Sequence, residues 1–162
     1  MVRSFSLHME GLSPAALALN LAADRVCVGG RNVFKVFGIN ASDQDDNGTF
    51  VELVNLRVPP PGKNVNLNYS CCDVAWSPHE EGLIASAATN GAVCLWDLVK
   101  PTRSKLDHVF PDHKRQCQKV IFHKTEQNVI LSGSQDGHMK LFDLRSRELA
   151  ADFSSGPNGK CP

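Results

Sequence analysis

The sequence has 162 residues and no formal net charge, with 17 basic and 17 acidic residues. A chain of this length can bury a sizeable core. Its charge balance argues against a dedicated nucleic-acid binder, which would normally be basic. No apolar run is long enough to cross a bilayer, so we expect no direct membrane insertion. The six cysteines include no C-x-x-C pair, which favours reduced thiols over a disulfide framework or a zinc site.

The N-terminal third of the chain predicts a first group of β-strands. Alternating apolar residues indicate strands near residues 15–21, 25–29, 33–37 and 50–58. The third of these ends in Phe37-Gly38. The run Pro59–Gly62 cannot lie in a central strand, so it marks the passage to the next unit.

Two further units follow, and they align with each other without a gap. The second predicts strands near 71–76, 83–87, 92–97 and 106–110, and the third near 117–122, 129–133, 139–143 and 148–153. Gly91 and Gly137 occupy the same place in the two units, in turns where glycine accepts positive φ at little cost. Residues 154–162 have no strand pattern, so we expect a disordered tail there.

The spacing between the two units, about 46 residues, is close to the period of WD repeats. The second unit ends in Trp96-Asp97 and the third in Phe142-Asp143. The sequence therefore resembles WD-repeat β-propellers, which are built from four-stranded blades. We expect an all-β fold in residues 1–153, with about three blades in units near 14–58, 70–110 and 111–153. Because propellers usually close at about 4–8 blades, three units leave the ring open, and we expect further blades in a full-length protein.

The resemblance implies a buried polar network in the third unit. In the family, a histidine ahead of the first strand hydrogen-bonds a turn aspartate, which is tied to a strand Ser or Thr and to the Trp. Carried across, these residues are His113, Asp136 and either Ser132 or Ser134. Phe142 stands in the place of the Trp and has no N–H to donate.

The second unit matches this network less well. It has Leu67 and Asn90 at the places of the histidine and the aspartate, and it keeps only the Trp. A histidine, an aspartate and a serine can also form a hydrolase triad, but no nucleophile elbow surrounds either serine. We therefore expect no catalytic residue, no cofactor and no metal. The structural network is predicted to comprise Trp96, Asp97, His113, Ser132, Ser134, Asp136, Phe142 and Asp143.

Loops between strands form a second candidate site. The turns of the second and third units, together with a basic pair between the units, should line one rim of the propeller. Such a rim is a usual docking surface, because a rigid scaffold presents its loops in fixed positions. The alternative is ordinary solvated loop charge. The candidate residues are Thr89, Asn90, Lys114, Arg115 and Gln135.

Longer stretches look like one group of WD-repeat proteins, the propeller subunits of the activating GATOR subcomplex. These stretches are residues 30–36, 55–58, 87–91, 113–115 and 131–145. The resemblance implies a non-enzymatic scaffold that assembles with other GATOR WD-repeat subunits. It would act in the cytoplasm and, by association, at the lysosomal surface, where the complex relays amino-acid sufficiency to mTOR complex 1.

A second resemblance points to another class. Phe142-Asp143-Leu144-Arg145 loosely resembles the Trp-Asp-x-Arg box of propellers that act as substrate receptors of cullin-4 ubiquitin ligases. The phenylalanine weakens this likeness, and the second unit has Val99 in place of the arginine. The sequence favours the GATOR scaffold over the substrate receptor.

Overall fold

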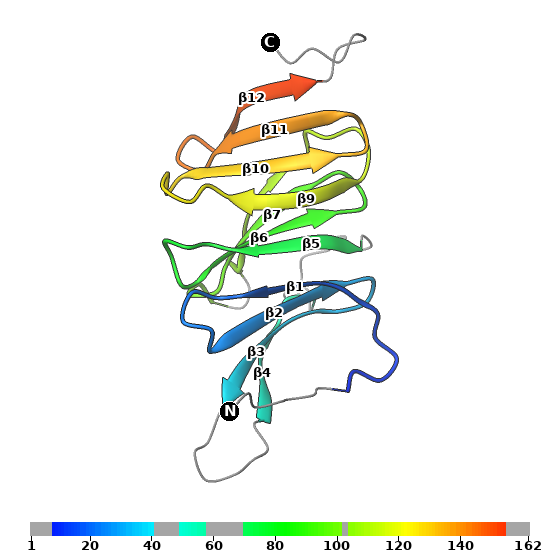
Figure 1. Ribbon diagram of the computed structural model, residues 1–162, viewed down its shortest axis with the longest axis vertical. Coiled ribbons are helices and arrows are strands. Elements are labelled where there is room, and N and C mark those ends of the chain that lie inside the picture. Colours follow the sequence, from blue (N-terminus) through cyan, green and yellow to red (C-terminus); the bar gives the residue numbers. More distant parts are fainter. Residues whose placement is uncertain (1–7, 41–48, 58–69, 102–103, 155–162) are drawn as a thin grey trace, which may run out of the picture.

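The computed structural model describes residues 8–40, 49–57, 70–101 and 104–154. These residues form three separate four-stranded antiparallel sheets, which follow one another in chain order along the long axis of the molecule (Figure 1). The predicted all-β arrangement of three four-stranded blades is confirmed, and within the described residues the blades do not close into a ring.

Each blade is an antiparallel meander in which consecutive strands are hydrogen-bonded neighbours. The first blade contains β1 (Pro14–Leu19), β2 (Arg25–Gly30), β3 (Phe34–Asn40) and β4 (Thr49–Asn55). The second contains β5 (Cys71–Trp76), β6 (Leu83–Ala88), β7 (Val93–Asp97) and β8 (Leu106–Phe110). The third contains β9 (Cys117–Phe122), β10 (Val129–Ser134), β11 (His138–Asp143) and β12 (Glu148–Ser154).

The strand ends of the first blade differ most from expectation. β1 stops at Leu19, because Asn20 folds the chain into a turn in which its side-chain oxygen accepts a hydrogen bond from the amide of Arg25 at 2.9 Å. β4 stops at Asn55, whose side chain accepts the amide of Arg57 at 3.0 Å. The proline-rich passage lies outside the described residues.

The C-terminal boundary also differs from expectation by one residue. Ser154, predicted to belong to the tail, is the last residue of β12 and pairs with His138. Residues 155–162 lie outside the described part of the chain.

Two apolar cores lie between the blades and hold them together. In the first, the rings of Phe34 and Trp96 meet edge to face with centroids 5.1 Å apart. In the second, Phe110 packs on Phe142 at 4.5 Å. Each core joins side chains from two successive blades, so burial of apolar surface at the blade interfaces stabilises the fold.

The pairing register confirms the alignment of the repeats. Trp96 lies opposite Ile84, and Phe142 lies opposite Ile130. In the first blade Phe37 takes the same place, opposite Val26. The three aromatic residues therefore occupy one position of the repeat, and each is buried.

Candidate functional site

The third blade contains a chain of hydrogen bonds centred on His113. This histidine lies in the connection between β8 and β9, and its Nδ1 is 3.0 Å from the Oδ2 atom of Asp136 in the β10–β11 turn. Its Nε2 is 2.7 Å from the hydroxyl oxygen of Ser132 on β10. Because a carboxylate only accepts, Nδ1–H donates to Asp136. The network thus joins the entry to the blade, one of its strands and its turn.

Asp136 is the most heavily bonded member. Besides His113, it accepts the amide of Lys114 at 2.9 Å and the amide of His138 at 3.0 Å. Burial raises the pKa of Asp136, but these hydrogen bonds and the nearby imidazole lower the pKa by more than burial raises it. The net pKa of Asp136 therefore lies well below its ordinary value. The carboxylate is therefore held in its charged form as an acceptor.

Ser134, the other candidate, has a different role from Ser132. Its hydroxyl is within hydrogen-bond distance of the carbonyls of Arg115 and Gln116, at 3.1 and 3.0 Å. It also accepts the amide of Asp136. Ser134 therefore ties the turn to the β8–β9 connection, whereas Ser132 is the serine that bonds the imidazole of His113.

The serine, histidine and carboxylate are ordered as in a hydrolase triad, but their surroundings do not suit catalysis. Ser132 is 3% exposed and His113 is 5% exposed. Ser132 lies within a regular strand, not at the sharp strand-to-helix turn that exposes a nucleophile. What this arrangement can do is fix the connection and the turn relative to the sheet.

The second blade carries the complementary half of the network. The indole N–H of Trp96 donates to the hydroxyl of Ser86 at 2.9 Å, and Ser86 occupies the position of Ser132 in the repeat. The aspartates that follow the aromatic residues have their own task. Asp97 accepts the amide of Val99, and Asp143 accepts the amide of Arg145, so each aspartate caps the turn after its strand.

The five candidate docking residues lie in three connections that contact one another. Thr89 and Asn90 are in the β6–β7 turn, Lys114 and Arg115 in the β8–β9 connection, and Gln135 in the β10–β11 turn. All five are exposed. The β6–β7 turn approaches the connection so closely that a Cβ on Gly91 would lie 2.5 Å from the carbonyl oxygen of His113. The amide of Gln135 donates to the carbonyl of Gln116 at 3.0 Å.

Asp73 is a linking residue that the sequence reasoning missed. It lies on β5, yet it accepts the backbone amide of Val120 at 3.1 Å and pairs with the Lys119 ammonium at 3.1 Å, both on β9 of the next blade. Asp73 and Lys119 occupy the same position in successive blades. The sequence does carry one signal of this contact, because an acidic and a basic residue stand at the same repeat position in successive units.

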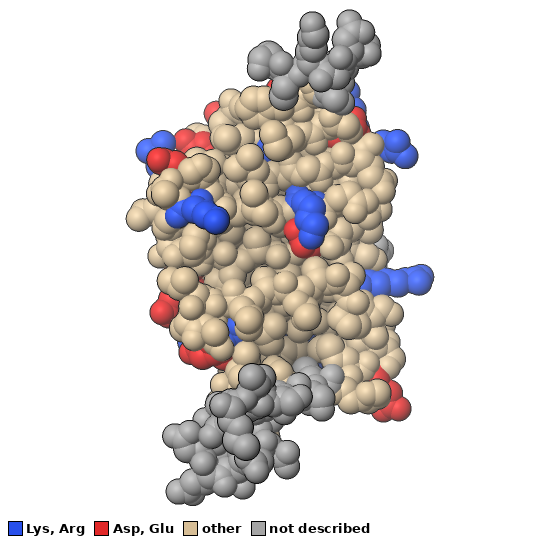
Figure 2. Space-filling view, viewed as in Figure 1, with Lys and Arg blue, Asp and Glu red and all other residues tan. Residues whose placement is uncertain are grey.

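Charged side chains do not gather into a patch of one sign on the face that Figure 2 shows. Among the described residues, no cluster of three or more His, Cys, Asp or Glu side chains could hold a metal ion. No helix within those residues is long and apolar enough to span a membrane. Burial raises the pKa of the Cys71 and Cys117 thiols to about 12, so both stay protonated at neutral pH.

Comparison with known proteins gives the same repeats. The family described as WD domain, G-beta repeat matches residues 65–97 and 104–143. GATOR2 complex protein WDR24 from Danio rerio is 48% identical over 94% of this chain and 18% of its own length. The Homo sapiens protein of that name is 45% identical over the same shares. Wdr24 from Drosophila melanogaster is 47% identical over 88% of this chain and 17% of its own length.

The chain therefore spans less than a fifth of the length of these curated relatives. Within that span the likeness runs through all three blades rather than through the two matched repeats alone. Residues 65–97 and 104–143 thus match WD repeats, and the chain is similar to the part of the WDR24 proteins that it aligns with.

Proposed function

We propose that this chain is a non-enzymatic scaffold of the GATOR2 type, which takes part in positive regulation of mTOR complex 1 in response to amino acids. The observation that carries the proposal is the 45–48% identity to WDR24 proteins over 94% of the chain. The partners would be other GATOR2 subunits with WD repeats. The place of action would be the cytoplasm and, by association, the lysosomal surface.

The geometry supports docking as the physical mechanism. The network around His113 and the contact at Gly91 hold three connections in fixed relative positions. Lys114, Arg115 and Gln135 stand on these connections with exposed side chains. Preorganised loops lose little conformational entropy when a partner binds, so a few residues on such a rim can supply most of the binding energy.

Affinity purification of the tagged chain from cells, followed by mass spectrometry, tests the proposal. We expect GATOR2 subunits to be recovered. Lys114→Glu reverses a charge on the proposed rim, and recovery should fall. The matched control is Lys124→Glu, an exposed lysine in the β9–β10 connection at the opposite ends of the strands, for which recovery should not change.

Other outcomes would contradict the proposal in recognisable ways. Recovery of the cullin-4 adaptor without GATOR2 subunits would favour the substrate-receptor alternative. In the structure Arg145, the arginine of that alternative motif, is engaged by Asp143 of its own chain at 3.2 Å. Equal loss of recovery in Lys114→Glu and Lys124→Glu would contradict the proposed docking rim, but it would not contradict the assembly of the chain with GATOR2 subunits.

A further inference from the structure

The connections at one end of the strands carry positive side chains that the chain does not neutralise. The connections after even-numbered strands share this end, because each blade is an antiparallel meander. The surface, here called the basic rim, consists of Arg31 after β2, Arg57 after β4, and Lys114 and Arg115 after β8. Arg31, Lys114 and Arg115 are exposed. Among residues 8–40, 49–57, 70–101 and 104–154, no acidic side chain pairs with any of these three.

Most cations elsewhere in the described residues have an acidic partner in the chain itself. Lys35 of the first blade pairs with Glu52 at 2.8 Å. Arg147 of the third blade pairs with Asp107 of the second at 3.2 Å. Lys124, at the opposite ends of the strands, is a single exposed lysine outside this pattern. Positive charge without a partner therefore gathers on the basic rim rather than over the surface at large.

The acidic residues near the basic rim do not cancel its charge. Asp136 is held by an imidazole N–H and by two backbone amides. Asp112 is half-buried in the β8–β9 connection, and Glu10 is exposed ahead of β1; within the described part of the chain neither pairs with a cation. The connection from residue 56 to residue 70 contains no acidic residue. An excess of positive charge therefore remains on this end of the blades.

The backbone that carries these cations is fixed by hydrogen bonds. The amide of Lys114 donates to Asp136 at 2.9 Å, and the carbonyl of Arg115 accepts a serine hydroxyl of β10 at 3.1 Å. The guanidinium of Arg57 donates to the carbonyl of Arg31 at 2.5 Å. A partner that binds here has to order side chains but not loops, which lowers the entropic cost of binding.

The β6–β7 turn lies between the two ends of the basic rim. On one side the amide of Thr89 donates to the carbonyl of Ser70, at the end of the β4–β5 connection, at 3.0 Å. On the other side a Cβ on Gly91 would lie 2.7 Å from the carbonyl oxygen of Arg115. The cations of the first blade and those of the β8–β9 connection are thus joined by a continuous row of contacting connections.

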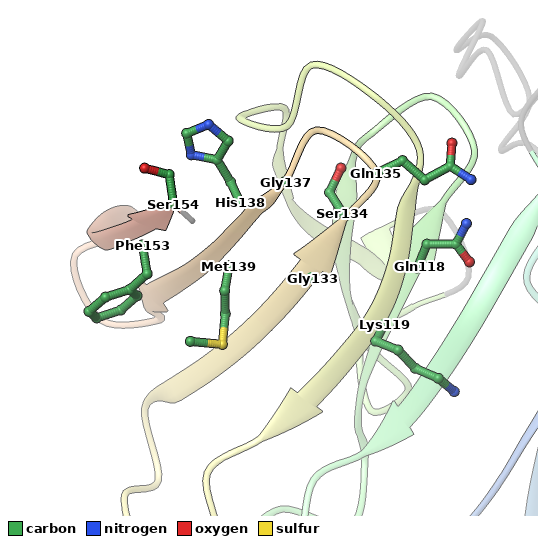
Figure 3. A pocket seen from close by; sticks show the side chains of 10 residues that line it. All are labelled: Gln118, Lys119, Gly133, Ser134, Gln135, Gly137, His138, Met139, Phe153 and Ser154. Atoms are coloured by element: carbon green, nitrogen blue, oxygen red, sulfur yellow. The ribbon is translucent and has the colours of Figure 1, made fainter. Parts of the chain in front are cut away.

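Uncharged hydrogen-bonding groups accompany the cations along this row. Thr89 and Asn90 are exposed in the β6–β7 turn, and Gln118 and Gln135 are exposed on the third blade. Figure 3 shows the side chains of Gln118 and Gln135 extending from the third blade in the same direction. Amide and hydroxyl groups donate to and accept from peptide groups. Cations separated by such groups suit a polypeptide, whereas a membrane surface is bound by apolar side chains and denser basic clusters.

We propose that the basic rim binds an acidic segment of a partner protein, with carboxylates facing both Arg31 and the Lys114–Arg115 pair. The proposal rests on the docking function proposed above and names the chemistry of the partner. Guanidinium groups bind carboxylates in a two-pronged geometry that adds specificity to charge. The two ends of the rim lie on different blades, and packed sheets are about 10 Å apart. An extended chain covers that distance in about three residues, so the acidic positions should be at least that far apart.

Carbodiimide cross-linking of the purified complex tests the proposal at one atom. The reagent activates a carboxylate, the Nζ of Lys114 attacks the activated carbon, and an amide bond forms as the reagent leaves as its urea. We expect mass spectrometry to find Lys114 joined to an Asp or Glu in a segment richer in acidic than in basic residues. Lys114→Arg keeps the charge but removes the amine, so partner recovery should persist while the cross-link disappears. Lys124, the matched exposed lysine, should not be joined to that segment.

A binding assay on the 162-residue chain tests the same chemistry without the complex. The probe is a fluorescent peptide with two Glu-Glu pairs separated by Ser-Gly-Ser, and the control peptide has Gln in place of each Glu. We expect the Glu peptide to bind at least about tenfold more tightly, and added salt to reduce this difference. Lys114→Gln and Arg31→Gln should weaken binding, whereas Lys124→Gln should not. Unchanged melting curves would show that the variants remain folded.

The two assays separate failure of this proposal from failure of the docking function. Recovery of GATOR2 subunits with no cross-link from Lys114, together with equal binding of the Glu and Gln peptides, would overturn the acidic partner and leave the docking function standing. Binding of the Glu peptide through Lys114 without recovery of GATOR2 subunits would support the acidic partner and contradict the docking function. Tighter binding to phosphatidylserine vesicles than to the Glu peptide, lost in Lys114→Gln, would overturn the proposal in favour of an anionic membrane.

Discussion

Asp136 accepts hydrogen bonds from a side chain and from two backbone amides, so its removal affects the third blade at several points. Asp136→Ala leaves the Nδ1–H of His113, which is buried, without its acceptor. We expect a loss of about 1–3 kcal/mol in the free energy of unfolding, the usual cost of stranding a buried polar group. Thermal and urea denaturation would measure it. Glu126→Ala, at an exposed site in another connection, should change little, and an unshifted melting curve for Asp136→Ala would refute the network.

The same carboxylate predicts how stability depends on pH. The pKa of Asp136 is lowered in the folded state, whereas an aspartate in the unfolded chain has a pKa of about 3.9. Its contribution is therefore present above about pH 4 and is lost as the pH falls towards the folded pKa. The stability difference between the parent chain and Asp136→Asn should shrink as the pH falls below about 4. A difference in unfolding free energy that stays constant from neutral to acid pH would contradict this assignment.

Two glycines in equivalent turns should respond differently to the same substitution. Gly91 and Gly137 have φ values of 86° and 83°, so alanine strains the backbone at both. At Gly137 the added Cβ would meet nothing within 4 Å, but at Gly91 it would lie 2.7 Å from the carbonyl oxygen of Arg115.

We expect Gly137→Ala to cost about 1 kcal/mol, from the backbone strain alone. Gly91→Ala should cost about 1–3 kcal/mol more, because the connection above it has to move. Urea denaturation of the two variants side by side would measure the difference. Equal losses would show that the approach of this turn to the β8–β9 connection contributes nothing to stability.

Strands and their order were predictable from the sequence, because alternation, glycine turns and the aromatic–aspartate endings recur in register. The side chains that cap the connection after the first strand of each blade were not predictable from the sequence. Asn20, Ser77 and His123 hold the same repeat position, directly after the first strand, and each accepts nearby amides with a different side-chain atom. The shared feature is an acceptor in a given place rather than a residue type, so comparing letters does not find it.

Contacts between blades were the hardest part of the site to predict. The hydrogen bond from the Val120 amide to Asp73 depends on how one sheet stacks on the next. Local propensity carries no information on that stacking. The network in the third blade was easier to approach, because the family places its histidine and aspartate at known spacings. The choice between Ser132 and Ser134 needed coordinates, and so did the separate role of Asp97 and Asp143, which accept amides of their own turns.

At the scale of the whole molecule, the second blade has neighbours on both faces, whereas the first and third each have one neighbouring blade among the described residues. All six residues of β6 are buried, whereas no residue of β12 is. In stacked repeats, stability is roughly the sum of each unit and its interfaces, so the central blade should open last. We expect amide hydrogen exchange to be slowest in β6 and β7 and fastest in the outer strands β4 and β12. Both outer strands are edges of their sheets, so equal protection of β12 and β6 would mean that the three blades open only as a single unit.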